Sequence, residues 1–254
     1  MSPELGVDPQ LLPLLFGVAT LAGFIDAIAG GGGLLAIPAL LWAGLPPLQA
    51  LGTNKLQAVF GSFAASANFL HKGAIRPGEM AEAVLLTFLG ALLGTYAVQQ
   101  FDSTLLGRML PLLLIVFALY FLFSPRVGDI DARRRIGPRL FAATAGFGIG
   151  FYDGFFGPGA GSFFALAYVA LLGYNLRKAT AHAKLLNFTS NLAALLAFMA
   201  GGHLLWLVGL TMGAGQLIGA WLGSHMVLRH GASLVRPLLV IVSLAMAARL
   251  LLAE

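Results

Sequence analysis

The stretch "GFIDAIAGGGG" (Gly23–Gly33) places one carboxylate, Asp26, and four consecutive glycines inside a run that is otherwise apolar. Glycine weakens a helix, and an acidic side chain at membrane depth is costly. A second stretch, "GFYDGFFGPGAG" (Gly150–Gly161), repeats the pattern around Asp153. The two stretches predict helices that break at equivalent points of a duplicated unit.

The composition is that of a membrane protein. Hydrophobic residues make up 59% of the chain and charged residues 10%, with a mean hydropathy of +0.89, whereas soluble domains carry about 25% charged residues. Several apolar runs approach the roughly 20 residues that a helical span needs. We expect the net charge of +5 to come from basic loops that fix membrane orientation rather than from nucleic-acid binding.

An internal repeat runs through the chain at an offset of about 127 residues. "QALGTNKLQ" (Gln49–Gln57) aligns with "KATAHAKLL" (Lys178–Leu186), and "GALLGTY" (Gly90–Tyr96) aligns with "GQLIGAW" (Gly215–Trp221). Glycines four apart in the last pair predict close helix packing. The chain therefore reads as two copies of one membrane unit, at 1–125 and 139–254, joined by a basic cytoplasmic linker at 126–138.

Each copy contains five apolar elements. We expect them at about 10–29, 34–45, 48–71, 80–99 and 105–123, and at about 139–156, 161–173, 177–200, 204–223 and 234–252. The second element of each copy is short, so it either spans incompletely or is re-entrant. Five crossings per copy place most Lys and Arg on one side, whereas four crossings divide them. The positive-inside rule favours five, and an odd number makes the copies inverted repeats.

Two lysines within helices are the sharpest signal for a site. Lys55 and Lys184 each lie ~12 Å along a helix, too deep for the side chain to reach a headgroup fully. Lys184, Asn187 and Asn191 share one helix face. Thr53, Asn54, Gln57 and His182 lie nearby in the sequence. We expect these side chains to bind a small anion near the middle of the membrane.

The glycines and acids have two interpretations each. The run Gly30, Gly31, Gly32 and Gly33, with Gly157 and Gly159 in the second copy, either serves packing or exposes backbone N–H groups at the start of a short helix, where anions bind. Asp26 and Asp153 either cap a helix boundary or carry a coupling proton. The chain has no cysteine and no nucleophile–base or metal-ligand pattern, so we expect no enzyme activity, cofactor or metal.

The paired motifs closely resemble the TauE/SafE sulfite exporter family over nearly the whole chain. The matching segments are "GFIDAIAGGGGLLAIPALLWAGLPPLQALGTNKLQ" and "GFYDGFFGPGAGSFF" followed by "KATAHAKLLNFTSN". The resemblance implies an all-α, multi-pass transporter of small sulfur-containing anions such as sulfite or sulfoacetate. Lys55, Lys184, Asn54 and the glycines fall on the family's motif positions.

Taken together, residues and resemblance predict alternating access around a central anion site in the cell inner (cytoplasmic) membrane. Proton coupling through Asp26 or Asp153 is an option. The alternative functions are an anion channel and an uncoupled permease for small carboxylate or inorganic anions. The expected partners are the anion and the lipid bilayer; the oligomeric state stays open, with a homodimer as one option.

Overall fold

The computed structural model describes residues 7–75, 77–123 and 133–230. Its regular structure is helical. The first half contains η1 (Pro9–Leu11), α1 (Leu12–Ala29), α2 (Gly33–Trp42), α3 (Pro47–His71), η2 (Pro77–Met80), α4 (Ala81–Val98) and α5 (Ser103–Phe123). The second contains α6 (Pro138–Phe141), a π-helical turn (Ala142–Gly146), α7 (Phe147–Phe155), α8 (Ala160–Leu172), α9 (Leu176–Ala200) and α10 (Trp206–His230).

This is the polytopic all-α fold that the sequence predicts. Three segments are long and apolar enough to cross a membrane within the described residues: Pro9–Ile28, Gly78–Val98 and Leu176–Ala200. The helix α2 has 10 residues and α8 has 13, so the short second element of each half is confirmed as a helix. The predicted element at 234–252, and most of the predicted linker at 126–138, lie outside the described residues.

Local sequence sets the main helix boundaries. Pro47 occupies the first turn of α3, where its missing N–H costs nothing. The Asn175 side chain caps α9 by accepting a hydrogen bond from the Lys178 backbone N–H at 2.9 Å. Gly30 ends α1 with φ 76°, in the left-handed region that glycine adopts without steric cost.

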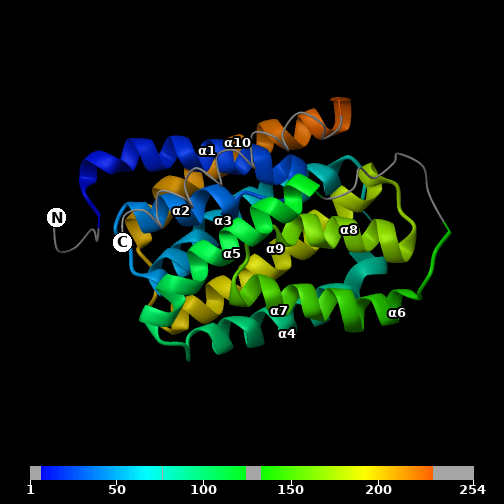
Figure 1. The fold of residues 1–254 in the computed structure, drawn as a ribbon. Coiled ribbons are helices and arrows are strands. Elements are labelled where there is room, and N and C mark those ends of the chain that lie inside the picture. The colour runs from blue at the N-terminus through cyan, green and yellow to red at the C-terminus, as the bar shows by residue number, and fades with distance from the viewer. Residues whose placement is uncertain (1–6, 76, 124–132, 231–254) are drawn as a thin grey trace.

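Close packing between halves depends on glycine. A Cβ added at Gly94 in α4 would clash with the Phe151 carbonyl of α7, and one added at Gly219 in α10 would clash with the Thr20 carbonyl of α1. The predicted packing role of these glycines is confirmed. The helices α1 and α10 consequently lie along one edge of the bundle and α4 and α7 along the opposite edge, with α3 and α9 between them (Figure 1).

Equivalent helices of the two halves run in opposite directions. Contacts between α1 and α10 proceed in parallel, from Gly215 beside Phe16 to Gly223 beside Phe24. The ribbon shows α1 and α3 running one way and their counterparts α7 and α9 the other (Figure 1). Because α1 and α3 share a direction, α2 is a return segment between them. An inverted repeat requires this reversal; its orientation in a membrane stays a prediction.

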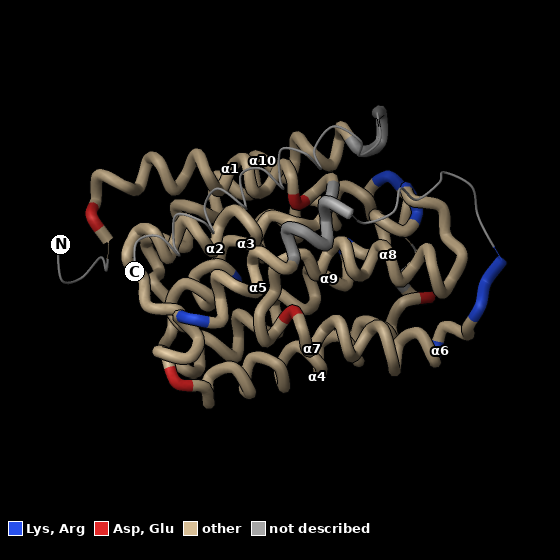
Figure 2. The backbone as a smooth tube through the Cα atoms, viewed as in Figure 1, with Lys and Arg blue, Asp and Glu red and all other residues tan. Residues whose placement is uncertain are grey.

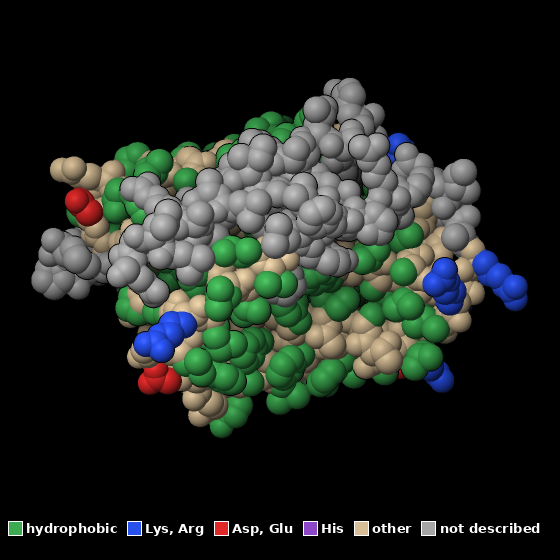
Figure 3. Space-filling view, viewed as in Figure 1, with side chains coloured by type: hydrophobic (Ala, Val, Ile, Leu, Met, Phe, Trp, Pro, Cys, Tyr) green, Lys and Arg blue, Asp and Glu red, His purple; other side chains and the backbone are tan. Residues whose placement is uncertain are grey.

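The outside of the bundle is apolar. Exposed large side chains form a stripe on α4 (Leu85, Leu89, Leu93, Tyr96) and another on α10 (Leu210, Leu217, Ile218, Trp221). Figure 3 shows hydrophobic side chains over the described middle of the visible face, and Figure 2 shows most charged positions towards the helix ends. Water-soluble proteins rarely expose apolar surface of this extent, so lipid is the matching solvent.

Candidate anion site

The two helix breaks meet at the centre of the bundle. The α1–α2 break contains Gly30, and the α7–α8 break contains Gly159, with φ 82°. A Cβ added at Gly30 would clash with the backbone N of Ser162, and its neighbour Gly161 packs against Gly30 in turn. Glycine at both breaks therefore lets two interrupted backbones come into contact, which bulkier residues would prevent.

A lysine and an aspartate join the halves on one side of this contact. The Lys184 Nζ from α9 lies 3.0 Å from Asp26 Oδ2 on α1, and it also donates to the Asp26 backbone carbonyl. The other carboxylate oxygen, Oδ1, accepts from the Gly32 backbone N–H at 3.3 Å. Asp26 thus satisfies a free N–H of the helix break, as its capping interpretation predicts, and it also carries a buried ion pair.

The equivalent pair joins the halves again on the other side. The Lys55 Nζ from α3 lies 2.6 Å from Asp153 Oδ1 on α7, and the two side chains are 1% and 2% exposed. Ser190 donates to Asp153 Oδ2, and Lys55 donates to Asn191 Oδ1 at 3.2 Å. A buried charge of either sign is tolerated only when it is paired and hydrogen-bonded, and both conditions hold here.

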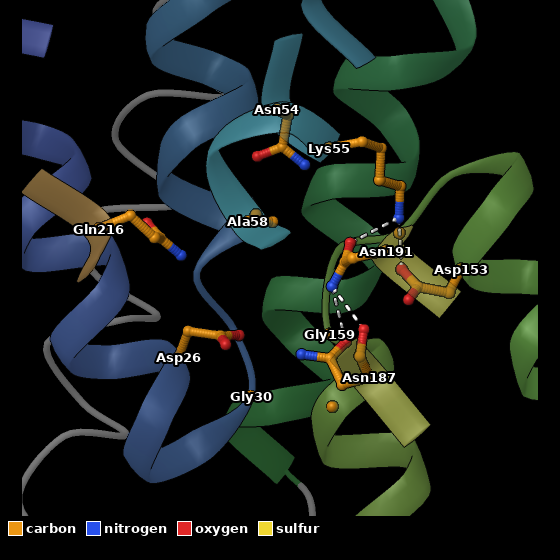
Figure 4. A pocket seen from close by; sticks show the side chains of 13 residues that line it. Asp26, Gly30, Asn54, Lys55, Ala58, Asp153, Gly159, Asn187, Asn191 and Gln216 are labelled. Carbon is orange, nitrogen blue, oxygen red and sulfur yellow. Dashed lines mark hydrogen bonds and ion pairs between the residues drawn. The ribbon is translucent and has the colours of Figure 1, made fainter. Parts of the chain in front are cut away.

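A small polar pocket lies between Asp26 on one side and the Lys55–Asp153 pair on the other (Figure 4). Its cavity volume is about 20 Å³, which holds about one water molecule. The predicted site residues that line it are Asp26, Gly30, Gly33, Asn54, Lys55, Asp153, Gly157, Gly159, Asn187 and Asn191. A solute larger than water would therefore need the surrounding helices to move apart.

The other predicted site residues lie outside the lining. Gln57 holds Asn54 in place, since its Nε2 donates to Asn54 Oδ1 at 3.0 Å. Thr53 Oγ1 accepts from the Leu205 N–H at 3.1 Å. Gly31 and Gly32 directly precede α2, and their carbonyls accept from the N–H groups of Leu34 and Leu35. Lys184 donates to Asp26 and does not line the pocket.

His182 also lies apart from the pocket. Its ring packs against Tyr168 and Tyr174, with centroids 5.5 and 5.0 Å away. Its Nδ1 lies 2.8 Å from the Lys178 carbonyl, so this nitrogen carries the proton in the neutral ring. These contacts form an aromatic cluster near the start of α9, and they assign His182 no contact with the pocket.

Gln216 of α10 lines the pocket but was not expected from the sequence. It is 2% exposed, and its Oε1 is buried with no hydrogen-bond partner within the described residues. A Cβ added at Gly61 of α3 would lie 2.5 Å from Gln216 Cγ, so that glycine makes room for the side chain. Its counterpart in the repeat is the apolar Ala91, so the repeat gives no polar signal at this position.

The arrangement is suited to binding and release of an anion. Lys55 is the pocket's cation among the described lining residues, and Asn54 and Asn191 add amides beside it. In this structure the negative charges of the two aspartates balance the positive charges of the two lysines. An incoming anion must therefore compete with a carboxylate for the ammonium group, so binding and ion-pair opening are linked.

Comparisons with known proteins agree with this architecture. The family described as "Sulfite exporter TauE/SafE" matches residues 15–250. A "Probable membrane transporter protein" of Haemophilus influenzae is 51% identical over 247 residues, covering 97% of this chain and 96% of the relative. "Probable membrane transporter protein YfcA" of Escherichia coli K12 is 52% identical over 245 residues, covering 96% and 91%. No solved structure matches the chain.

Proposed function

Because the chain belongs to the sulfite exporter TauE/SafE family of membrane transporters, we propose that it carries small sulfur-containing anions across the cytoplasmic membrane. Sulfite, sulfoacetate and other organosulfonates are the substrate class. The observation that supports this proposal is the buried ammonium of Lys55, which faces a central pocket beside amides and broken helices. Charge-assisted hydrogen bonds suit the oxygens of a sulfite or sulfonate group.

Alternating access is the mechanism that this geometry favours. The pocket lies where the two halves touch, and both lysine–aspartate pairs cross between the halves. Rocking of one half against the other would open the pocket to one side at a time. The basic residues Arg133, Arg134 and Arg135 then lie at the cytoplasmic face, which is the orientation that the positive-inside rule gives.

A flux assay tests the function directly. Purified protein in proteoliposomes should transport sulfite or an organosulfonate in preference to sulfate and acetate, and a panel with taurine added defines the substrate range. Saturation and counterflow, in which external substrate accelerates exit of labelled internal substrate, are expected of a carrier. Absence of flux for every sulfur-containing anion in the panel would refute the proposed substrate class.

The alternative is an anion channel. Its conducting form needs a continuous water-filled path, whereas the pocket described here has a volume of about 20 Å³, room for about one water. The relatives named as membrane transporters favour a carrier. Flux that rises linearly with concentration and shows no counterflow would favour the channel instead.

A further inference from the structure

The two lysine–aspartate pairs are equivalent in the repeat but have different surroundings. Lys184 Nζ is bound both by the Asp26 carboxylate, at 3.0 Å, and by the backbone carbonyl of that residue. Lys55 Nζ is bound by Asp153 at 2.6 Å and by the Asn191 side-chain amide at 3.2 Å. A backbone carbonyl stays in place when the carboxylate is protonated. Lys184 therefore keeps a fixed partner, whereas Lys55 keeps an amide on a rotatable side chain.

The pairs also differ in their position relative to the pocket. Lys55 and Asp153 both line it, and Figure 4 shows their side chains meeting at its edge beside Asn191. Lys184 does not line it; its Nζ would lie 3.4 Å from a Cβ built on Gly161, which forms part of the wall. An anion in the pocket can therefore reach Lys55 without breaking the backbone contact that holds Lys184.

Charge balance limits what the pocket accepts. With both pairs intact, the two ammonium groups and two carboxylates sum to zero. A monovalent anion added alone leaves one uncompensated negative charge in a buried site, which is costly. If one carboxylate takes a proton at the same time, the loaded site is neutral again. Anion and proton together keep both the loaded and the unloaded site free of net charge.

From this geometry we propose that the Lys55–Asp153 pair couples anion to proton, with one proton on Asp153 for each anion at Lys55. This inference rests on the proposed function and deepens it. A proton taken from the open side of the membrane neutralises the Asp153 carboxylate and releases the Lys55 ammonium, and the anion takes the place of the carboxylate. On release the carboxylate gives up the proton and rebinds Lys55. The direction of net transport follows the sum of the two gradients.

The groups that face Asp153 are consistent with this role. They are Lys55 from α3 and Ser190 from α9, with Asp26 of α1 contributing a second negative charge across the pocket. Tyr152 precedes Asp153 on α7, and its hydroxyl donates to the Pro158 carbonyl. From α4, the Thr87 hydroxyl donates to the Gly146 carbonyl in the π-helical turn, and the Thr95 hydroxyl donates to the Gly154 carbonyl of α7. Protonation of Asp153 therefore removes the carboxylate charge that holds Lys55.

The Lys184–Asp26 pair has a structural role, because it holds α9 of one half against α1 of the other. Its lysine stays bound to the α1 carbonyl when Asp26 is neutral, so neutralising Asp26 frees no ammonium for an anion. Asp26→Asn and Asp153→Asn are consequently a matched pair of variants. They make the same chemical change at equivalent positions of the repeat. We expect coupling to be lost in D153N and kept in D26N.

The test uses methanesulfonate and isethionate, monovalent sulfonates whose charge does not change near neutral pH. In wild-type proteoliposomes, a gradient of one pH unit should accumulate either anion up to about tenfold, the value for one proton per anion. A pH dye should record one proton entering with each anion, and a clamped membrane potential should have no effect. D26N should keep the ratio of one proton per anion and the response to the pH gradient, whatever flux it retains. D153N should retain anion exchange but lose accumulation by the pH gradient, and its net flux should become sensitive to potential.

Each outcome bears on one claim. If D153N is driven by the pH gradient as wild type is, or if D26N loses coupling instead, the assignment to Lys55–Asp153 is wrong while the transport function stands. If D153N does not fold, the wild-type proton count decides, because anion movement without protons overturns the coupling. If wild type carries no sulfur-containing anion at all, the proposed function is refuted and the coupling falls with it.

Discussion

Replacing Lys55 with methionine tests whether the pair with Asp153 stabilises the contact between halves. The Nζ–Oδ1 distance is 2.6 Å and both side chains are buried. With an effective dielectric constant of about 20, the Coulomb attraction at this distance is about 6 kcal/mol. Desolvation of the two charges offsets part of that attraction. Breaking one partner of a buried pair nevertheless costs about 3–5 kcal/mol, because the other charge is left uncompensated.

We therefore expect K55M to lower the free energy of unfolding by about 3 kcal/mol or more, and K55M/D153N to recover much of the loss. Denaturant titration in detergent micelles measures all three variants and wild type, which completes a double-mutant cycle. K72M, at the exposed end of the same helix, is the matched control and should change stability by less than about 0.5 kcal/mol.

The cycle has a clear refuting result. If K55M costs less than about 1 kcal/mol, or if the losses of K55M and D153N simply add, the two side chains do not act as a buried pair. The same proteins can be used to measure anion binding. K55M should bind sulfite and organosulfonates more weakly than wild type, since the pocket loses its ammonium group.

Three other predictions concern the glycine break, the unpartnered amide and the architecture. G32V should abolish transport while membrane insertion is kept, because its Cβ would lie 2.8 Å from Asp26 Cβ; unchanged flux would contradict this. Q216M should weaken anion binding severalfold in a thermal-shift titration, since Gln216 lines the pocket and its amide nitrogen, a hydrogen-bond donor, is turned toward it (Figure 4); L217M on the exposed face of α10 is the control. Single cysteines at Pro47 and Asn175 should be labelled from opposite sides of the membrane, and labelling from one side would contradict inverted halves.

The sequence predicted most helices because their signals are local. Apolar runs, Pro47 at a first turn and Asn175 at a cap mark boundaries that the structure places within a few residues. The π-helical turn at Ala142–Gly146 and the extension of α10 to His230 were not predicted. Neither has a residue pattern that separates it from ordinary α-helix, so packing between elements decides them.

The internal repeat also predicted which charged residues belong to the candidate site, although not how they are arranged. It picked out Lys55 with Lys184 and Asp26 with Asp153, because equivalent positions of two copies carried the same costly residue types. It could not identify Gln216, which has no polar counterpart in the first copy. That side chain enters the pocket because Gly61 on another helix leaves room for it.

The sequence by itself determined the membrane class and the all-α fold, and it predicted two copies of a broken-helix unit with a lysine and an aspartate at equivalent positions. Only the tertiary structure decided that each lysine pairs with the aspartate of the other half, across sequence separations of 98 and 158 residues. It also decided that Lys55 lines the pocket, whereas Lys184 donates a hydrogen bond to the Asp26 backbone carbonyl. Residue types and periodicity follow from local chemistry, but ion-pair partners depend on how two surfaces dock.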